Sequence, residues 1–201
     1  MKALFVIDMQ NDFIDGVLGS PEAQTIVPKV VEKIINTEDN DIIVFTMDTH
    51  YNNYLINTEE GKHLPIPHCI YGTKGWKINS NVMEASFYKE KNIKKIFNKS
   101  TFGYIWDIKK LTDCLYNVKS KNTELEITYA HPNDITEIEI VGLDTDFCVL
   151  ANALGLKAAF PNVPITIDAA CCAGSTPEWH EKALDMLEHC HFNVINRTKG
   201  E

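Results

Sequence analysis

The chain contains 201 residues, of which 44% are apolar, 23% are charged and 9% are aromatic. This length and composition indicate a single globular domain over residues 1–201 and exclude an extensively disordered chain. The formal net charge is −9 without any basic cluster, which disfavours a nucleic-acid partner, and no apolar run approaches the roughly 20 residues that cross a bilayer, so we expect no membrane partner.

The N-terminal segment and the cysteines indicate a reduced, cytoplasmic protein. Asp8 interrupts the short apolar run at the N-terminus, and no small-residue cleavage site of a signal peptide follows it. The six cysteines include no C-x-x-C pair, and the neighbours Cys171 and Cys172 are poorly placed to bridge each other. We expect most of the cysteines to pack as small apolar residues, although one of them can still carry chemistry.

Short apolar runs alternate along the chain with segments of helical periodicity. Strands are predicted, in chain order, at residues 3–7, 41–46, 94–97, 137–141, 164–168 and 192–195. Helices are predicted between them at residues 23–36, 104–116, 147–160 and 176–190. This alternation predicts an α/β fold with three layers, α/β/α, around a central, mostly parallel, doubly wound sheet.

Two segments do not fit this alternation. Residues 51–76 are rich in proline and glycine and predict a long loop, which in ordered proteins is usually functional. Together with the end of the preceding strand they form a candidate metal-site loop at about 48–76. Residues 120–136 are polar and predict a surface excursion in the form of a small hairpin.

Polar side chains follow several of the predicted strands. Asp8 comes directly after the first strand, where a carboxylate serves either as a cap or as a general base with a raised pKa. Lys99 follows the strand at 94–97, and its ordinary interpretation is a surface lysine. The carboxyl ends of parallel strands meet at one edge of the sheet. Asp8 and Lys99 therefore become stronger candidates for a site if Cys148 lies at the same edge.

A group of metal-capable side chains follows the second strand. Asp48 and His50 are two residues apart and point to one side if the strand continues, and His68 lies in the loop beyond them. Further candidate ligands between them are Glu59, Glu60 and His63. Such a set suits Zn²⁺, Mn²⁺ or Fe²⁺, while the alternative is an exposed polar loop without a metal.

Cys148 lies at the start of the predicted helix 147–160, directly after a strand that ends at Gly142. A thiol at a helix N-terminus meets unpaired amides and the positive end of the helix dipole. We therefore expect a lowered thiol pKa and backbone donors for an oxyanion. The alternative is a buried cysteine that only packs in an apolar helix.

Three separated motifs together resemble those of the isochorismatase-like cysteine hydrolases. They are VIDMQNDF with Asp8, NKSTFG with Lys99 and GLDTDFCVLANAL with Cys148, and the resemblance extends over nearly the whole chain. The segments TMDTH and EGKHLPIPHCIYGTKGW look most like the nicotinamidase branch of that superfamily.

The resemblance implies a role for each matching residue. Asp8, Lys99 and Cys148 would form a catalytic triad, and the amides of Asp144 and Cys148 would form an oxyanion hole after a cis peptide bond between Leu143 and Asp144. One divalent ion, zinc with iron or manganese as alternatives, would be held by Asp48, His50, Glu60 and His68. Glu59 and His63 compete with Glu60 for the third position.

Two departures from the family pattern concern the substrate. Asp144 stands where the family often has a small residue, and a carboxylate there opposes thiolate formation unless it faces solvent or a cation. The aromatic residue that stacks on the substrate ring is replaced by Leu64 or Pro65. Phe13 matches an aromatic near the substrate, and Trp106 or Tyr104 is expected to supply a second wall.

The resemblance implies hydrolysis of nicotinamide to nicotinate and ammonia through a cysteine thioester, with a small-molecule amide as partner and a homo-oligomeric state. One alternative is another amidase of the superfamily that acts on N-carbamoyl or ureido compounds. A doubly wound nucleotide-binding module would need a glycine-rich turn after the first strand, and residues 8–12 contain no glycine. A non-catalytic metal-binding or scaffolding protein is the third alternative.

Overall fold

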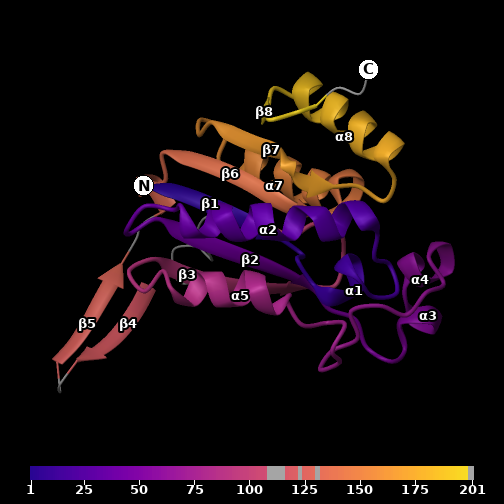
Figure 1. The fold of residues 1–201 in the computed structure, drawn as a ribbon, viewed down its shortest axis with the longest axis horizontal. Coiled ribbons are helices and arrows are strands. Elements are labelled where there is room, and N and C mark those ends of the chain that lie inside the picture. Colours follow the sequence, from indigo (N-terminus) through magenta and orange to yellow (C-terminus); the bar gives the residue numbers. More distant parts are fainter. Residues whose placement is uncertain (108–115, 122–123, 130–131, 199–201) are drawn as a thin grey trace.

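The computed structural model describes residues 1–107, 116–121, 124–129 and 132–198. The strands of the central sheet are β1 (Lys2–Ile7), β2 (Ile42–Asp48), β3 (Ile93–Lys99), β6 (Glu137–Leu143), β7 (Ile165–Ala173) and β8 (Asn193–Ile195). They all run parallel in the order β3-β2-β1-β6-β7-β8, and the winding direction reverses between β1 and β6 (Figure 1). The predicted doubly wound sheet is confirmed.

The helices lie between these strands along the chain. They are α1 (Asn11–Ile14), α2 (Pro21–Ile35), α3 (Tyr54–Asn57), α4 (Glu59–His63), α5 (Ser80–Phe87), α7 (Leu150–Ala159) and α8 (Pro177–His189). The long helices begin where the sequence supplies a cap. The hydroxyls of Ser20 and Thr176 accept a hydrogen bond from the amide three residues further on, and a proline follows each of them.

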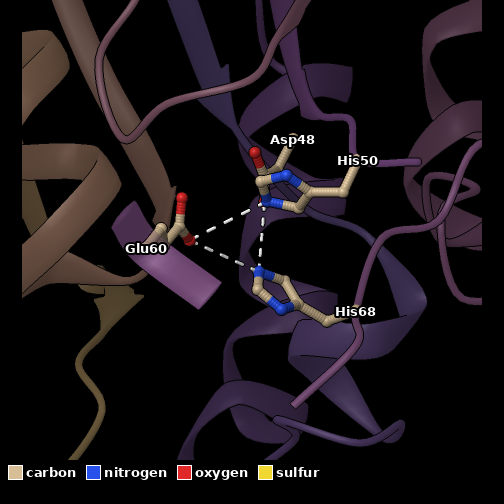
Figure 2. Close-up of side chains that lie close together, drawn as sticks. All are labelled: Asp48, His50, Glu60 and His68. Carbon is tan, nitrogen blue, oxygen red and sulfur yellow. Dashed lines mark ion pairs between the residues drawn. The ribbon is translucent and has the colours of Figure 1, made fainter. Parts of the chain in front are cut away.

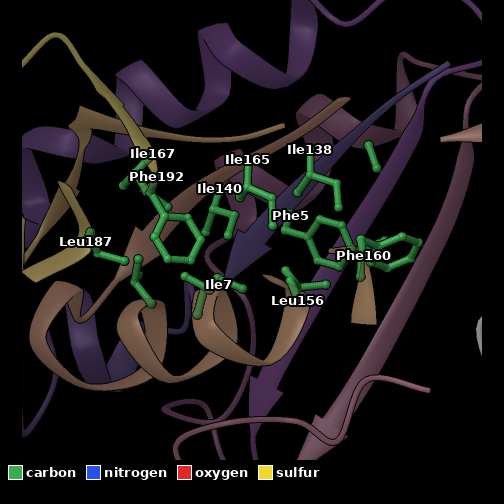
Figure 3. Packing of buried hydrophobic residues seen from close by; sticks show 14 of the residues in the cluster. Phe5, Ile7, Ile138, Ile140, Leu156, Phe160, Ile165, Ile167, Leu187 and Phe192 are labelled. Atoms are coloured by element: carbon green, nitrogen blue, oxygen red, sulfur yellow. The ribbon is translucent and has the colours of Figure 1, made fainter. Parts of the chain in front are cut away.

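The strands bury side chains on both faces of the sheet, which gives the molecule its three layers. On one face, Phe5 of β1 belongs to a cluster with Leu156 of α7 and Leu187 of α8 (Figure 3). On the other face, Leu4 of β1 belongs to a second cluster with Val30 of α2. Successive residues of a strand point to opposite faces, so a continuous apolar run such as β1 requires helices on both sides.

Two of the predicted helices differ from the structure. The predicted helix 147–160 begins with a π-helical turn, Thr145–Val149, before α7 continues it. The predicted helix 104–116 is wrong at both ends, because residues 104–107 are not helical and Tyr116 begins a strand; residues 108–115 lie outside the described part. Trp106 and, in part, Tyr104 pack in the core instead of on a helix face.

The polar excursion contains the expected hairpin. Its antiparallel strands are β4 (Tyr116–Lys121) and β5 (Glu124–Tyr129), and Figure 1 shows them extending away from the sheet beyond β3. The expected loop at 51–76 holds the short helices α3 and α4. Among the helices in the described ranges, none has the length and apolar character needed to cross a membrane.

Candidate active site

The reactive side chains predicted from the sequence meet at the carboxyl edge of the sheet. Asp8 follows β1 directly, Asp48 ends β2 and Lys99 ends β3, where the register pairs it with Asp48. Cys148 lies in the π-helical turn after β6. Strands β1 and β6 are neighbours at the reversal of the winding, which is where sites on such sheets form.

Lys99 holds the acid and the thiol together. Its Nζ lies 2.6 Å from Oδ2 of Asp8 and donates a hydrogen bond to Sγ of Cys148 over 3.4 Å. The hydroxyl of Thr46 donates to the other oxygen of Asp8 at 2.6 Å. All four side chains are buried, so their mutual contacts replace water as the partners of the charges. A proton can therefore pass between Asp8 and Cys148 without entering solvent.

Burial decides the protonation of this group. It raises the pKa of Cys148 well above the ordinary value, the charges of Asp8 and Asp48 add to this, and only Lys99 acts against them. Burial also raises the pKa of Asp8 despite the nearby Lys99. Burial would lower the pKa of Lys99, but the neighbouring carboxylates outweigh it and keep that pKa high. The expected lowering of the thiol pKa is wrong, because the buried thiol stays neutral until a base removes its proton.

The turn that carries Cys148 is anchored from several sides. It begins at the cis peptide bond between Leu143 and Asp144, as the resemblance implied. The carboxylate of Asp146 accepts hydrogen bonds from the amide and the hydroxyl of Ser175, at 2.8 and 2.6 Å. The hydroxyl of Thr145 lies 2.8 Å from Nδ1 of His180. These contacts fix the path of the backbone around the thiol.

Four candidate metal ligands converge beside Lys99. Each of Asp48, His50, Glu60 and His68 offers one ligand atom, and these atoms lie within 4.8 Å of one another (Figure 2). His50 Nε2 is buried and lies 2.9 Å from Asp48 Oδ2, yet it makes no hydrogen bond with a residue of the described ranges. Two imidazoles and two carboxylates around one point fit a divalent cation such as zinc, which would satisfy this orphaned nitrogen.

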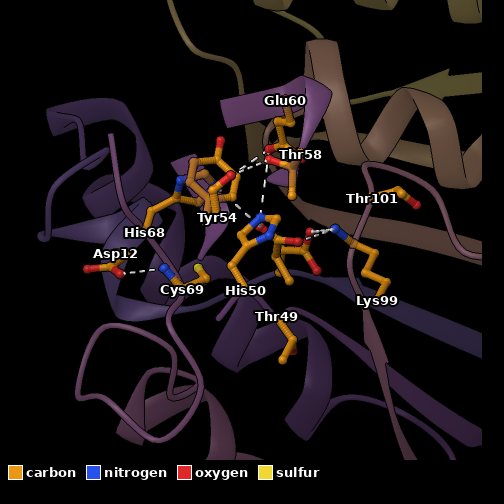
Figure 4. A network of polar contacts seen from close by, with 12 residues as sticks. Asp12, Thr49, His50, Tyr54, Thr58, Glu60, His68, Cys69, Lys99 and Thr101 are labelled. Atoms are coloured by element: carbon orange, nitrogen blue, oxygen red, sulfur yellow. Dashed lines mark hydrogen bonds and ion pairs between the residues drawn. The ribbon is translucent and has the colours of Figure 1, made fainter. Parts of the chain in front are cut away.

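The neighbours of these ligands set their orientation. Nδ1 of His68 lies 2.8 Å from the carbonyl oxygen of Ile66, which leaves Nε2 directed to the cluster. The ring of Tyr54 lies against both imidazoles, with ring centroids 4.4 Å from His50 and 5.1 Å from His68 (Figure 4). Gln10 binds both backbone polar groups of Asp48, at 2.7 and 2.8 Å. Tyr54, Gln10 and Thr46 were not predicted from the sequence, since only their place in the fold connects them with the site.

The short helix α4 separates the competing third ligands. The hydroxyl of Thr58 accepts a hydrogen bond from the amide of Gly61 and so starts this helix. Glu60 then faces the histidines, with its Oε1 at 3.8 Å from His50 Nε2. Glu59 instead pairs with Lys62 at the surface. The geometry favours Glu60 over Glu59, and His63 lies outside the cluster.

A cavity of about 740 Å³ opens onto the thiol and the metal cluster. Its apolar walls are Phe13, Leu18, Leu64, Phe102 and Phe147, and it also contacts Asp144, Cys148 and His68. The structure brings Phe13 to the cavity but not Trp106. The indole of Trp106 is buried in the core, edge-on to Phe5 at 5.2 Å, and its Nε1 donates to Asn152. Phe102 and Phe147, whose rings lie 5.2 Å apart, stand where we expected Trp106 or Tyr104.

Comparisons with known proteins agree with this geometry. A family model described as "Isochorismatase domain" matches residues 2–199. The nicotinamidase of Saccharomyces cerevisiae is 26% identical over 231 residues, which cover 98% of this chain and 100% of the yeast protein. The structure of a nicotinamidase from Bacillus subtilis superposes with a TM-score of 0.68 at 26% identity, covering 96% of this chain and 98% of that one. The structure of a pyrazinamidase from Pyrococcus horikoshii in complex with zinc gives 0.69 at 25% identity, covering 98% and 99%. The chain therefore belongs to the isochorismatase domain family.

Proposed function

We propose that the protein is a metal-dependent cysteine amidohydrolase that converts nicotinamide and water into nicotinate and ammonia. The observation that carries this proposal is the position of Lys99, with its Nζ 2.6 Å from Asp8 and 3.4 Å from the sulfur of Cys148, because Cys148 itself lines an apolar cavity. An acid, an amine and a thiol in one buried group are what nucleophilic attack on an amide needs.

The proposed reaction starts with a proton transfer from Cys148 to Asp8. The raised pKa of both groups, caused by burial, makes this transfer between neighbours more favourable than release of the proton to solvent. The charge of Lys99 stabilises the thiolate, which attacks the amide carbon and forms the carbon–sulfur bond. The amides of Asp144 and Cys148, in the turn after β6, are the proposed donors to the oxyanion.

Asp8 then completes both halves of the reaction. It returns its proton to the amide nitrogen as the carbon–nitrogen bond breaks and ammonia leaves. A water molecule attacks the remaining thioester, Asp8 takes a proton from it, and the carbon–sulfur bond breaks to give the acid. The thiol regains its proton from Asp8 at the end of the cycle.

Asp48, His50, Glu60 and His68 are the proposed ligands of one divalent cation, with zinc as the first candidate because the donors are two imidazoles and two carboxylates. When bound, the cation supplies Lewis-acid chemistry, which polarises water and holds a lone pair of the substrate ring. The zinc in the pyrazinamidase of Pyrococcus horikoshii supports this choice.

The proposal is tested by ammonia release from nicotinamide, pyrazinamide and an N-carbamoyl amino acid, with the zinc-loaded protein. We expect release from the two ring amides and none above background after Cys148→Ala, a variant that removes only the sulfur. The variant should keep the zinc content and the circular dichroism spectrum of the parent. Ammonia release by Cys148→Ala at the parental rate would refute the nucleophile, and release only from the N-carbamoyl compound would refute the substrate class.

A further inference from the structure

The side chain of Asp144 lies in the substrate cavity but has no part in the mechanism above. Its carboxyl group lines the same cavity as Cys148 and Phe13. Throughout the ranges that the structure describes, this carboxyl group has no hydrogen bond and no ion pair. By contrast, the nearby carboxylate of Asp146 is satisfied by two hydrogen bonds from Ser175.

The backbone keeps Asp144 at this position. Its carbonyl oxygen accepts hydrogen bonds from the amides of Phe147 and Val149, at 3.1 and 3.0 Å. The residue also follows the last pair of β6 with β7. Because both ends of the residue are tied into regular structure, the half-buried Asp144 stays at the cavity unless that structure itself moves.

The electrostatic surroundings leave Asp144 in need of a hydrogen-bond donor. Burial, with the like charges of Asp146 and Asp8 adding to it, raises the pKa of Asp144 to about 7. The charge of His68 lowers the pKa of Asp144 but is outweighed, and the buried cation Lys99 is occupied by Asp8 and by the sulfur of Cys148. A carboxylate without a partner in such a place is unfavourable, and a donor on a bound molecule would relieve it.

We infer that Asp144 is a specificity-determining residue whose carboxylate accepts a hydrogen bond from an N–H group that the substrate carries beside its scissile amide. This inference rests on the proposed amidase function and narrows its substrate class. The apolar walls, among them Phe13, Phe102 and Phe147, fit a flat ring, and a carboxylate in the same cavity as the thiol selects an amino or ring N–H group next to the carboxamide. An anionic substituent at that position is rejected by the same charge.

The test compares nicotinamides that carry an amino or a methyl group at ring position 2 or 4. The two substituents are of similar size, and only the amino group donates a hydrogen bond. At pH 8, where Asp144 is ionised, we expect kcat/KM to favour the amino compound by about tenfold or more at one of the two positions, as a hydrogen bond to a charged group implies. In Asp144→Ala this ratio should fall to about 1 by the same reasoning, and Asp144→Asn, which keeps an oxygen acceptor, should retain part of it.

Glu59→Gln is the matched control, because it removes the same charge from another residue of the cavity that pairs with Lys62 instead. It should leave the ratio of amino to methyl compound unchanged. An equal ratio in the parent and in Asp144→Ala at both ring positions would overturn the inference while leaving the amidase intact.

A measurement of binding affinity distinguishes a failure of this inference from a failure of the proposed function. Isothermal titration of the same compounds into Cys148→Ala, with and without Asp144→Ala, measures the preference without turnover. If the parent protein releases no ammonia while Cys148→Ala still binds the amino compound more tightly through Asp144, the proposed function is refuted and the inference is kept. Equal affinities with and without Asp144 would refute the inference in either case.

Discussion

Lys99 holds the charges of the site together at the scale of single residues. Its Nζ contacts Asp8 at 2.6 Å, Cys148 at 3.4 Å and Asp48 at 3.6 Å, and the side chain is almost completely buried. A buried lysine without partners would lose its proton, but three potential anions around it keep it charged. The lysine therefore links the nucleophile with the proposed metal site through one shared positive charge.

We predict that Lys99→Met lowers kcat/KM for ammonia release by at least about a hundredfold. The methionine keeps the length and packing of the side chain but leaves Asp8 and the nascent thiolate of Cys148 without a cation, and the loss of one electrostatic stabiliser costs about a hundredfold to a thousandfold. Alkylation of Cys148 at neutral pH, followed by mass spectrometry, should slow in parallel. Activity within tenfold of the parent, in a folded variant, would contradict the role of Lys99.

A second prediction concerns the effect of Asp144 on stability. Its pKa is raised to about 7 in the folded protein, above the ordinary value of an unfolded chain. The folded state thus binds the proton more tightly, so ionisation opposes folding as the pH rises from about 4 through 7. Asp144→Asn removes this penalty, and we expect it to raise the free energy of unfolding at pH 8 by about 1–3 kcal/mol relative to the parent.

The same comparison at pH 4 supplies the control for Asp144→Asn. There the carboxyl group is protonated in the folded state and about half protonated in the unfolded chain, so the difference between the variant and the parent should fall below about 1 kcal/mol. Urea denaturation followed by circular dichroism at both pH values gives the two differences, and contributions from acids that do not interact with Asp144 cancel between the proteins. A difference that is equal at pH 4 and pH 8 would show that Asp144 does not titrate in the folded state as expected.

At the scale of elements, the contacts of Trp106 explain why it lies in the core and not in the wall of the substrate cavity. The ring of Trp106 packs edge-on against Phe5 of β1 and lies 5.5 Å from the ring of Phe97 of β3. The side chain of Asn152, on α7, accepts from its Nε1 and from the amide of Tyr104. The segment after β3 therefore closes the core beneath α7, and its aromatics are held there by a buried amide that a sequence pattern does not reveal.

Because Trp106 lies in the core and Phe102 lines the cavity, substitutions of these two residues should have different effects on stability and KM. We predict that Trp106→Ala lowers the free energy of unfolding by about 3–5 kcal/mol, as expected for a buried indole, with little effect on KM in the folded fraction. Phe102→Ala, at the cavity wall and 40% exposed, should raise KM while costing less stability. Urea titrations and steady-state kinetics on both variants give the comparison. A rise in KM for Trp106→Ala together with unchanged stability would restore Trp106 as a substrate wall.

Sequence patterns predict strands and helices well when the buried residues recur with the period of a strand or a helix. The apolar runs of β1, β2, β6 and β7 are buried on both faces, and their sequences alone indicated a parallel sheet. The helix α5 was not predicted, because its hydrophobic periodicity is short and follows a long irregular segment. The π-helical turn at Cys148 was not predicted either, since nothing in its sequence distinguishes it from the first turn of an α-helix.

At the scale of the whole molecule, the topology performs most of the assembly of the site. Once the sheet is known to be parallel, Asp8, Asp48 and Lys99 must lie at one edge, because each ends or follows a strand of it. The choice of Glu60 over Glu59 depends on the rotation of one short helix, and the supporting contacts of Tyr54 join residues that no local pattern connects. Such contacts depend on tertiary packing, which a single sequence does not specify.

The proposed metal ligands come from two segments, this edge of the sheet and the long loop that follows it. Asp48 and His50 come from the end of β2, whereas Glu60 and His68 come from the long loop. Without a cation, the carboxylates of Asp48 and Glu60 repel each other. Burial is the largest cause of the raised pKa of Glu60, and this repulsion is the next. A bound ion would offset that repulsion and join the two segments.

We therefore predict that removing the metal lowers both activity and stability. Binding to the folded state alone adds about 4 kcal/mol at a free zinc concentration a thousandfold above Kd, which raises Tm by about 8–16 °C. Dialysis against dipicolinate should abolish ammonia release and lower Tm, and added zinc should restore both. His50→Ala is the control, since it removes one ligand and should make Tm insensitive to zinc. If the parent has the same Tm with and without zinc, and elemental analysis finds no stoichiometric ion, the four residues do not form a metal site, because a cation bound between strand and loop cannot leave the stability of the fold unchanged.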